Sequence, residues 1–226
     1  MKIIIATIKS WNIEHANKIK NDFKGQHQIE IIDKKEKLNL MDLEKFKPDF
    51  IFFPHWSYII PKSIYEKYEC VVFHMTDLPF GRGGSPLQNL IVRGIYNTKI
   101  SALRVEKELD AGPVYMKENL DLLGSAEEIY RRASDIIFRI MIPKFLKDEK
   151  LRPEKQQGEP VYFKRRRPEE SELKDFMSLQ QIYDYIRMLD AEGYPKAYLK
   201  LGNHKISFKN AAIKCGKVYA EVEMEE

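Results

Sequence analysis

One histidine and one aspartate in this chain have the types and surroundings that acid–base chemistry requires. His74 follows the apolar run Val71–Phe73 and precedes a turn-rich stretch, "MTDLPFGRGGSP". Asp110 stands 36 residues later in "LDAGPVY", two residues before a glycine. An imidazole titrates near neutral pH, and a neighbouring carboxylate orients the ring and raises its basicity. Together the two groups suit proton transfer. Each alone also suits a structural role, His74 at the end of a strand and Asp110 in a turn.

The elements that must position His74 are the strands of a sheet. Continuous apolar runs predict strands at residues 2–8, 28–33, 49–54 and 70–74, with segments of helical spacing between them. Such runs are typical of a parallel sheet that is buried on both faces. Open α/β sheets carry their active sites at the carboxyl ends of strands. We therefore predict a Rossmann-like α/β fold, with a mostly parallel sheet, helices on both faces and His74 at a strand's carboxyl end.

A long helix is predicted from Ser125 to Lys147. Ser125 and Glu128 have the spacing of a capping box, and Pro143 should kink or end the helix. Its apolar stripe comprises Ile129, Ala133, Ile136, Ile137, Ile140 and Met141.

The composition changes near residue 165, where a polar stretch and the run "KRRR" follow the long helix. We predict a catalytic domain over residues 1–165 and a small C-terminal α+β subdomain over residues 166–226. A helix at 178–190, capped by Ser178 and Gln181, should pack one apolar stripe before three final strands. That stripe comprises Leu179, Ile182, Ile186 and Leu189. The subdomain is expected to complete an acceptor pocket or to form a homodimer contact.

Composition sets limits on the function. The 226 residues carry 38 basic and 34 acidic side chains, a formal charge of +4, which suits an anionic small molecule and does not by itself imply nucleic acid. No apolar run approaches the ~20 residues that cross a bilayer. Two distant cysteines and scattered histidines show no ligand spacing, so no metal site is predicted. A cytoplasmic location without membrane association is expected.

The stretch "FHMTDLPFGRGGSP" followed by "LDAGPVY" resembles the folate-dependent formyltransferases. The resemblance extends upstream to "PDFIFFPHWSYIIP" and downstream to "FKRRRPEES" and "GYPKAYL", so that it covers roughly residues 48–202. It implies an enzyme that moves a formyl group from N10-formyltetrahydrofolate, a cosubstrate, to an amine. It also implies that His74 and Asp110 meet in the folded protein and act as the catalytic residues.

The resemblance implies two further groups of site residues. Those expected to bind the folate are Trp56, Tyr58, Ile60, Leu103 and Val105. Those expected to bind the acceptor are Thr76, Arg82, Gly83, Arg165 and Arg166. Alternatives remain for several of them, because Trp56 and Tyr58 also suit a core, Arg82 also suits an exposed surface, and "KRRR" also suits a solvated charge run.

The sequence departs from the family at one position beside His74. Val72 stands where the family has an asparagine, which is expected to donate to the formyl oxygen as negative charge develops there. Losing one such donor typically costs ~10²–10³ in rate. Three explanations are open: His55, Thr76 or Asn89 substitutes for it, the protein is a slow or inactive relative, or the alignment is displaced by two residues.

The predicted acceptor is a nucleotide-linked amino sugar. The stretches "RRPEES" and "GYPKAYL" resemble sugar-nucleotide formyltransferases, in particular members of pseudaminic-acid-type pathways that act on a UDP-linked 4-amino-4,6-dideoxy sugar. Because the chain ends in the acidic "EVEMEE", which suits a phosphate backbone poorly, no nucleic acid partner is expected. The alternatives are a methionyl-tRNA formyltransferase-like enzyme and a non-catalytic module that binds folate or nucleotide sugar.

Overall fold

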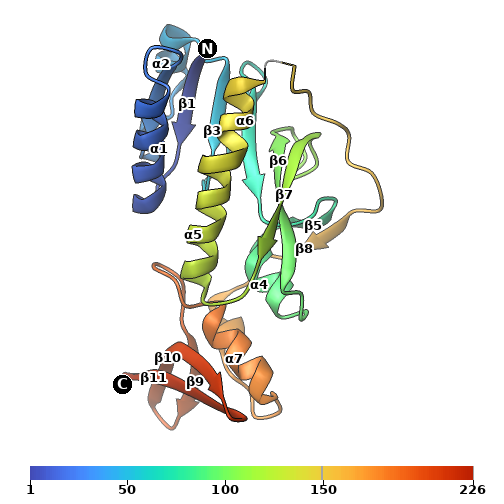
Figure 1. The fold of residues 1–226 in the computed structure, drawn as a ribbon. Helices are drawn as coiled ribbons and strands as arrows, with labels where there is room; N and C mark the ends of the chain where they lie inside the picture. The colour runs from blue at the N-terminus through green and yellow to red at the C-terminus, as the bar shows by residue number, and fades with distance from the viewer. Residues whose placement is uncertain (149, 226) are drawn as a thin grey trace. The chain divides into compact units, whose positions relative to one another are not determined.

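A six-stranded sheet forms the centre of the computed structural model, which describes residues 1–148 and 150–225 (Figure 1). Its strand order is β2-β1-β3-β4-β6-β7. The strands are β1 Lys2–Ala6, β2 Gln28–Ile32, β3 Phe50–Phe53, β4 Cys70–His74, β6 Asn97–Arg104 and β7 Val114–Asp121. The first four strands pair in parallel and β6 runs antiparallel to β4. The predicted fold class, an α/β fold with a mostly parallel sheet, is confirmed.

Side chains that alternate along the strands cover the two faces of the sheet. On one face Ile51, Phe53 and Cys70 pack with Leu43 of α2 (Leu40–Phe46) and Ile64 of α3 (Lys62–Tyr65). On the other face, Phe52 contacts Phe145 of α6 (Ile142–Lys147), and α1 (Ser10–Asp22) packs on β2. Burying a side chain of this size contributes about 1.5–3 kcal/mol, so the two apolar layers make the sheet a firm support for its loops.

The predicted long helix forms, but it contains a π-helical segment. It consists of α5 (Ala126–Ile136), the π segment Ile137–Met141 and then α6. The capping box is confirmed, since the Ser125 N–H donates to Glu128 and the Glu128 N–H donates to Ser125 Oγ. Pro143 cannot donate to the carbonyl four residues earlier, and the preceding N–H bonds five residues back. The wider turn shifts the helical phase, so Ile140 is 41% exposed, contrary to the predicted stripe.

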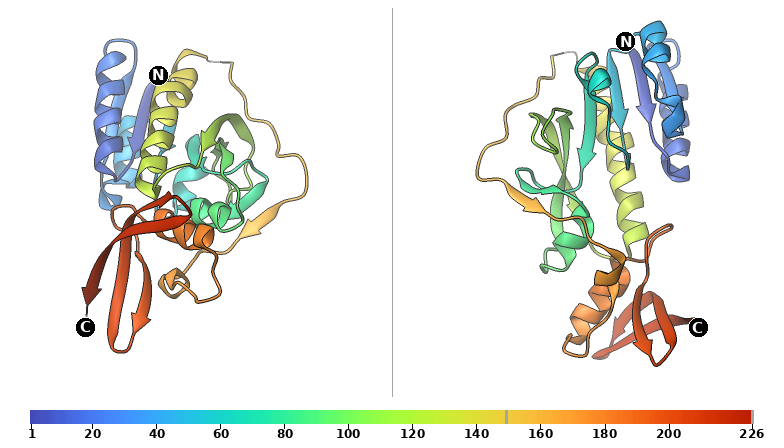
Figure 2. Two further views of the ribbon diagram at one scale, coloured as in Figure 1. Left: turned by 60° about the horizontal axis from the view of Figure 1, so that its bottom comes forward. Right: turned by 180° about the vertical axis from the view of Figure 1, so that it is seen from behind.

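A smaller antiparallel sheet lies near the C-terminus, with strand order β11-β10-β9 (Figure 2). Its strands are β9 Ala197–Leu201, β10 His204–Lys214 and β11 Lys217–Glu225. Helix α7 (Leu179–Arg187) packs on β10 and begins with the predicted capping box of Ser178. Ile186 and Leu189 of the predicted stripe are buried, whereas Leu179 at the first turn is 50% exposed, so the stripe was predicted one turn too long.

The chain forms two compact units that do not follow a single cut in the sequence. One unit comprises residues 1–82, 99–120 and 131–161, and the other comprises residues 83–98, 121–130 and 162–226. The shorter elements are η1 Lys35–Lys37, β5 Phe80–Gly83, α4 Pro86–Ile91, β8 Val161–Phe163 and η3 Pro168–Ser171. The division into domains at residue 165 stays a prediction. None of the helices in the described ranges combines the length and the apolar character that crossing a membrane requires.

Candidate active site

His74 is the last residue of β4, at the carboxyl end of a parallel strand. Its Nδ1 lies 3.6 Å from Asp110 Oδ2, and its Nε2 lies 2.7 Å from the carbonyl oxygen of Gly81. The two side chains are 9% and 11% exposed, so water screens their interaction only weakly. The structure therefore brings together the two residues that were predicted to meet, although they stand 36 residues apart.

The loop that carries Asp110 is tightly constrained. Asp110 has φ of 54°, a left-handed conformation that Asp tolerates better than most residues. Gly112 follows where the chain passes against β6, and a Cβ there would lie 2.0 Å from the carbonyl oxygen of Arg104. No other residue fits that approach. The aspartate and the glycine of "DAG" thus meet a conformational and a steric requirement of the loop.

The turn after His74 is held by polar groups of β6 and β7. Ser101, opposite His74 on β6, donates from Oγ to the carbonyl of Thr76 at 2.7 Å. Lys99 and Lys117 pair with Asp77, and Lys117 also donates to the carbonyl of Leu78. Ser101 was not predicted as a site residue, because nothing in the mixed sequence of β6 distinguishes it from the other polar residues of that strand. These contacts fix the backbone around the imidazole.

The residues predicted to contact folate gather on the face of the sheet that His74 shares. Trp56 and Val105 pack against the apolar cluster that contains Ile60, and Tyr58 meets the Trp56 ring edge-on at 5.4 Å. Leu103 lies opposite Val72 in the β4–β6 register. Because side chains two residues apart share a face, Val72 is the neighbour of His74 on that surface.

The indole of Trp56 has an unusual feature within this apolar group. Its Nε1 is buried and has no hydrogen-bond partner among the described residues. A buried donor without a partner costs about 1–3 kcal/mol, and a ligand acceptor would remove that cost. The Tyr58 ring beside it is 42% exposed. An aromatic wall of this kind suits a flat heterocycle.

The predicted substitutes for the family asparagine are engaged in other contacts. The Thr76 hydroxyl is fully buried and lies 3.4 Å from the Gly81 carbonyl. The Asn89 amide donates to three backbone carbonyls, those of Gly84, Ser85 and Lys164. The His55 ring meets the Trp11 ring edge-on, with 6.3 Å between their centres. Val72 itself packs on the apolar cluster.

The predicted acceptor residues Arg82 and Gly83 make contacts within the protein. Arg82 donates to Gln156 Oε1 through Nε (3.1 Å) and Nη2 (2.9 Å), and to Glu108 through Nη1. A Cβ on Gly83 would lie 2.4 Å from the Phe163 carbonyl oxygen, so strand β8 accounts for that glycine. Gln156 was not predicted as a site residue, because the polar stretch after the long helix contains no motif that marks it.

Arg165 and Arg166 belong to the other compact unit and are described within it. The backbone of Arg165 passes so close to Gly84 that a Cβ at 84 would lie 2.6 Å from the arginine Cβ. The Arg166 N–H donates to Ser85 Oγ, and its guanidinium donates to the Glu170 carbonyl and lies over the Tyr185 ring. These contacts order the start of the C-terminal segment.

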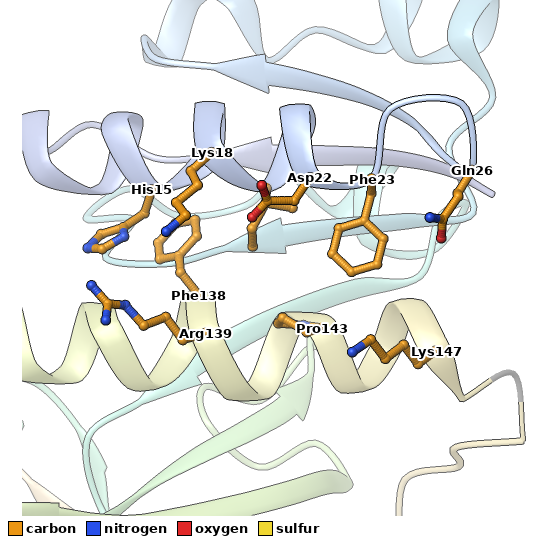
Figure 3. A pocket seen from close by; sticks show the side chains of 10 residues that line it. His15, Lys18, Asp22, Phe23, Gln26, Phe138, Arg139, Pro143 and Lys147 are labelled. Carbon is orange, nitrogen blue, oxygen red and sulfur yellow. The ribbon is translucent and has the colours of Figure 1, made fainter.

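A separate cavity of about 460 Å³ lies between α1 and the π segment with α6, as Figure 3 shows. None of the described residues that line it was predicted for catalysis or binding. His15 stacks on Phe138 with 5.5 Å between ring centres, and its Nε2 lies 3.5 Å from Asp135. We interpret this cavity as a gap between packed helices, because the His15 ring at one end of it already contacts Phe138 and Asp135.

The contacts of His74 define what the pair can do chemically. A carbonyl oxygen can only accept, so Nε2 carries a proton toward Gly81. Nδ1 faces Asp110 at 3.6 Å, beyond normal hydrogen-bond length, and can therefore hold or release a proton without breaking a tight contact. Catalytic contacts are often long in the absence of ligand and shorten when substrate binds. The arrangement suits general acid–base catalysis at an apolar wall.

Comparisons with known proteins give a consistent result. Residues 11–143 match the family described as Formyl transferase, and residues 168–225 match the methionyl-tRNA formyltransferase C-terminal domain. The methionyl-tRNA formyltransferase from Clostridium thermocellum superposes with a TM-score of 0.97 at 54% identity, covering 100% of this chain and 99% of that chain.

More distant relatives share parts of the sequence or the fold. Methionyl-tRNA formyltransferase of Rickettsia felis is 28% identical over 196 residues, covering 82% of this chain. This chain spans 63% of the length of that curated relative. A sugar N-formyltransferase from Shewanella sp FDAARGOS_354 superposes with a TM-score of 0.71 at 14% identity, covering 95% and 98% of the two chains. At that identity the likeness shows the fold alone.

Proposed function

The chain belongs to the formyl transferase family, and from that premise we propose that it transfers a formyl group from N10-formyltetrahydrofolate to the amino group of methionyl-tRNA. One observation carries the proposal: the 54% identity over nearly the whole of both chains to a methionyl-tRNA formyltransferase. The match of residues 168–225 to the C-terminal domain of such enzymes supports the same acceptor.

The sequence-based prediction of a nucleotide-linked amino sugar, with no nucleic acid partner, is wrong. Relatives at 54% and 28% identity are methionyl-tRNA formyltransferases, whose acceptor carries a tRNA. The prediction had treated the acidic C-terminus as a repulsive tail. In the structure Glu221 and Glu223 of that end lie on β11, where Lys209 of β10 pairs with both. Lys209 thus offsets part of this negative charge, and the acidity of this short end does not outweigh the 54% identity to a methionyl-tRNA formyltransferase.

The folate fits the apolar wall beside His74. N10-formyltetrahydrofolate supplies an electrophilic formyl carbon on a nitrogen leaving group. Trp56, Tyr58 and Val105 keep part of their surface exposed there, whereas Ile60 and Leu103 are buried and support that wall. These are the residues we propose to hold the pterin. Exclusion of water by that wall would strengthen the interactions of His74 and Asp110.

His74 and Asp110 are the proposed catalytic residues. The attacking amine must be neutral, and it loses a proton as its new bond to carbon forms. Nδ1 of His74 accepts that proton and returns it to the N10 nitrogen as the bond between N10 and the formyl carbon breaks, while Asp110 stabilises the intervening imidazolium at its 3.6 Å distance. Gly81 holds the opposite side of the ring, so the imidazole keeps one orientation while it is charged. The contacts at the end of β4 thereby both orient the imidazole and stabilise its positive charge.

The test supplies the donor and competing acceptors to the purified protein. N10-formyltetrahydrofolate is incubated with methionyl initiator tRNA, methionyl elongator tRNA, or a panel of UDP- and dTDP-linked amino sugars, and products are read by mass spectrometry. We expect formyl-methionine on tRNA, and no formyl group on sugars. His204→Asn is the matched control for His74→Asn, because His204 is an exposed residue of β10.

Two other outcomes would each overturn part of the proposed function. Formylation of a sugar and not of tRNA would overturn the proposed acceptor. Folate binding without formylation of any acceptor would favour the non-catalytic module and overturn the proposed activity.

A further inference from the structure

Gln156 connects the two parts of the chain that hold His74 and Asp110. Its Nε2 donates to the carbonyl oxygens of Asp110 and Gly112, each at 2.8 Å. Its Oε1 accepts two hydrogen bonds from Arg82, at 3.1 and 2.9 Å. Arg82 directly follows Gly81, whose carbonyl holds the His74 ring. One side-chain amide therefore joins the loop of the carboxylate to the strand beside the imidazole.

The chemistry of these partners requires an amide at this position. A guanidinium can only donate, so the atom that faces Arg82 must be the amide oxygen. Backbone carbonyls can only accept, so the atom that faces Asp110 and Gly112 must be the amide nitrogen. A carboxylate of the same size would place an oxygen against two carbonyl oxygens. Only an amide side chain of this length serves both sides.

The backbone around Gln156 is itself anchored to the sheet. Glu154 and Val114 exchange two backbone hydrogen bonds, at 2.7 and 2.9 Å, so the segment lies against the start of β7. Arg82 also reaches Glu108, which belongs to the same loop as Asp110. The backbone near Gln156 is thus held against β7, and its partner Arg82 is held by Glu108.

We propose that Gln156 is a positioning residue that holds the Asp110 carboxylate against His74. Its two donated hydrogen bonds fix the carbonyls on either side of Ala111, and this backbone includes the left-handed Asp110. Without them, the loop can relax to a more favourable conformation that carries the carboxylate away from the ring. The inference rests on the proposed catalytic roles of His74 and Asp110.

The experiment uses two substitutions and one matched control in the full chain. Gln156→Met keeps the length of the side chain and removes all four hydrogen bonds. Gln156→Glu keeps the acceptor for Arg82 and removes the donors to the loop. Gln157→Met is the control, because Gln157 is the exposed neighbour of the same type. The ligand-free proteins are labelled with ¹⁵N, and the His74 ring resonances are recorded at one pH, with Asp110→Asn as the reference for loss of the carboxylate.

Both Gln156 variants are expected to shift the His74 ring resonances in the same direction as Asp110→Asn, and Gln157→Met is expected to leave them in place. In formylation assays kcat should fall ~10–100-fold, as expected for a displaced catalytic group, while the KM for folate changes little. A folded Gln156→Met or Gln156→Glu variant with wild-type ring resonances would overturn the proposal.

The design separates this inference from the proposed function. If the wild-type protein formylates no acceptor, the proposed function fails, while the resonance measurement still tests Gln156. If wild-type turnover is normal and both Gln156 variants keep it, the positioning role fails and the proposed function stands. Should Gln156→Met not fold, Gln156→Glu supplies both measurements, because it retains the contact with Arg82.

Discussion

His74–Asp110 and Arg187–Asp184 are both buried pairs of a basic side chain and a carboxylate, and they differ in the length of the contact that joins them. The first pair is separated by 3.6 Å, and the second, whose side chains are 3% and 7% exposed, by 2.7 Å. The first joins residues 36 apart in sequence, and the second joins residues three apart on α7. Each pair lies within its own compact unit.

The pair on α7 is surrounded by further hydrogen bonds. Asp184 accepts from Tyr96 at 2.7 Å and from Gln180 at 3.1 Å. The Arg187 guanidinium donates to the carbonyls of Leu122 and Gly124, at 2.6 and 2.9 Å. The hydrogen bond to Asp184 also raises the pKa of Tyr96 above its ordinary value. The bonds to Tyr96, Leu122 and Gly124 tie α7 to neighbouring segments of the same unit.

The comparison separates a structural pair from a chemical one. A buried pair with its remaining donors and acceptors satisfied resists any change of charge, because every change breaks a hydrogen bond. The His74–Asp110 contact is 3.6 Å long, so a change of charge on the imidazole need not break a hydrogen bond between the two side chains. We expect substitutions at Arg187 or Asp184 to lower stability, and substitutions at His74 or Asp110 to lower turnover.

The largest effect is expected for Arg187→Met. Removing the guanidinium leaves Asp184 as a buried charge without its partner, which typically costs about 3–5 kcal/mol. Urea unfolding should show this loss in the free energy of unfolding. The control is Arg139→Met, since Arg139 is an exposed residue whose surface pair contributes at most about 1 kcal/mol. A loss below ~1 kcal/mol for Arg187→Met would show that the pair on α7 is not structural.

His74→Asn and Asp110→Asn should each lower formylation turnover by ~10² or more, equivalent to about 2.7 kcal/mol in the barrier. The reason is the lost acid–base group, so the melting temperature should change much less than for Arg187→Met. The double variant should be scarcely slower than either single one, because paired catalytic residues act as a unit. Near-normal turnover of His74→Asn would contradict the assignment of this pair to catalysis.

Val72→Asn tests whether the face beside His74 lacks an oxyanion donor. The amide replaces an apolar contact in the cluster that includes Trp56 and Val105, so stability should fall by ~1–3 kcal/mol. Turnover per folded molecule should rise, because Thr76 and Asn89 are committed to backbone carbonyls and the new amide can donate to the formyl oxygen. A decrease in turnover would indicate that another group already fills this role.

The smallest effect is expected for Ser178→Ala, at the start of the helix that carries the structural pair. The Ser178 hydroxyl accepts from the Gln181 N–H at 3.3 Å, and the loss of such a cap costs about 1 kcal/mol. Thermal unfolding measures it, with Ser57→Ala in an exposed loop as control. A loss as large as that of Arg187→Met would mean that the cap and not the ion pair dominates this unit.

The sequence by itself determined the features that local patterns encode. Apolar runs predicted the parallel strands, and the serine–glutamate and serine–glutamine spacings predicted both capping boxes, because their partners lie within four residues. The end of the run before His74 also placed that residue at the carboxyl end of a strand. Ile140 was wrongly predicted to be buried because of a local feature, the π-helical turn. An apolar stripe counted at 3.6 residues per turn does not reveal such a turn.

Only the tertiary structure decided which distant groups meet. Gln156 bonds Asp110 across 46 residues and Arg82 across 74, and no short motif specifies such pairings, because they depend on the path of the whole chain. The role of Arg187 could not be predicted for the same reason. An arginine beside an apolar helix stripe predicts solvent exposure. Arg187 is buried because the fold brings the carbonyls of Leu122 and Gly124 to its guanidinium. A side chain's type fixes which bonds it can make, and the fold fixes which of them it makes.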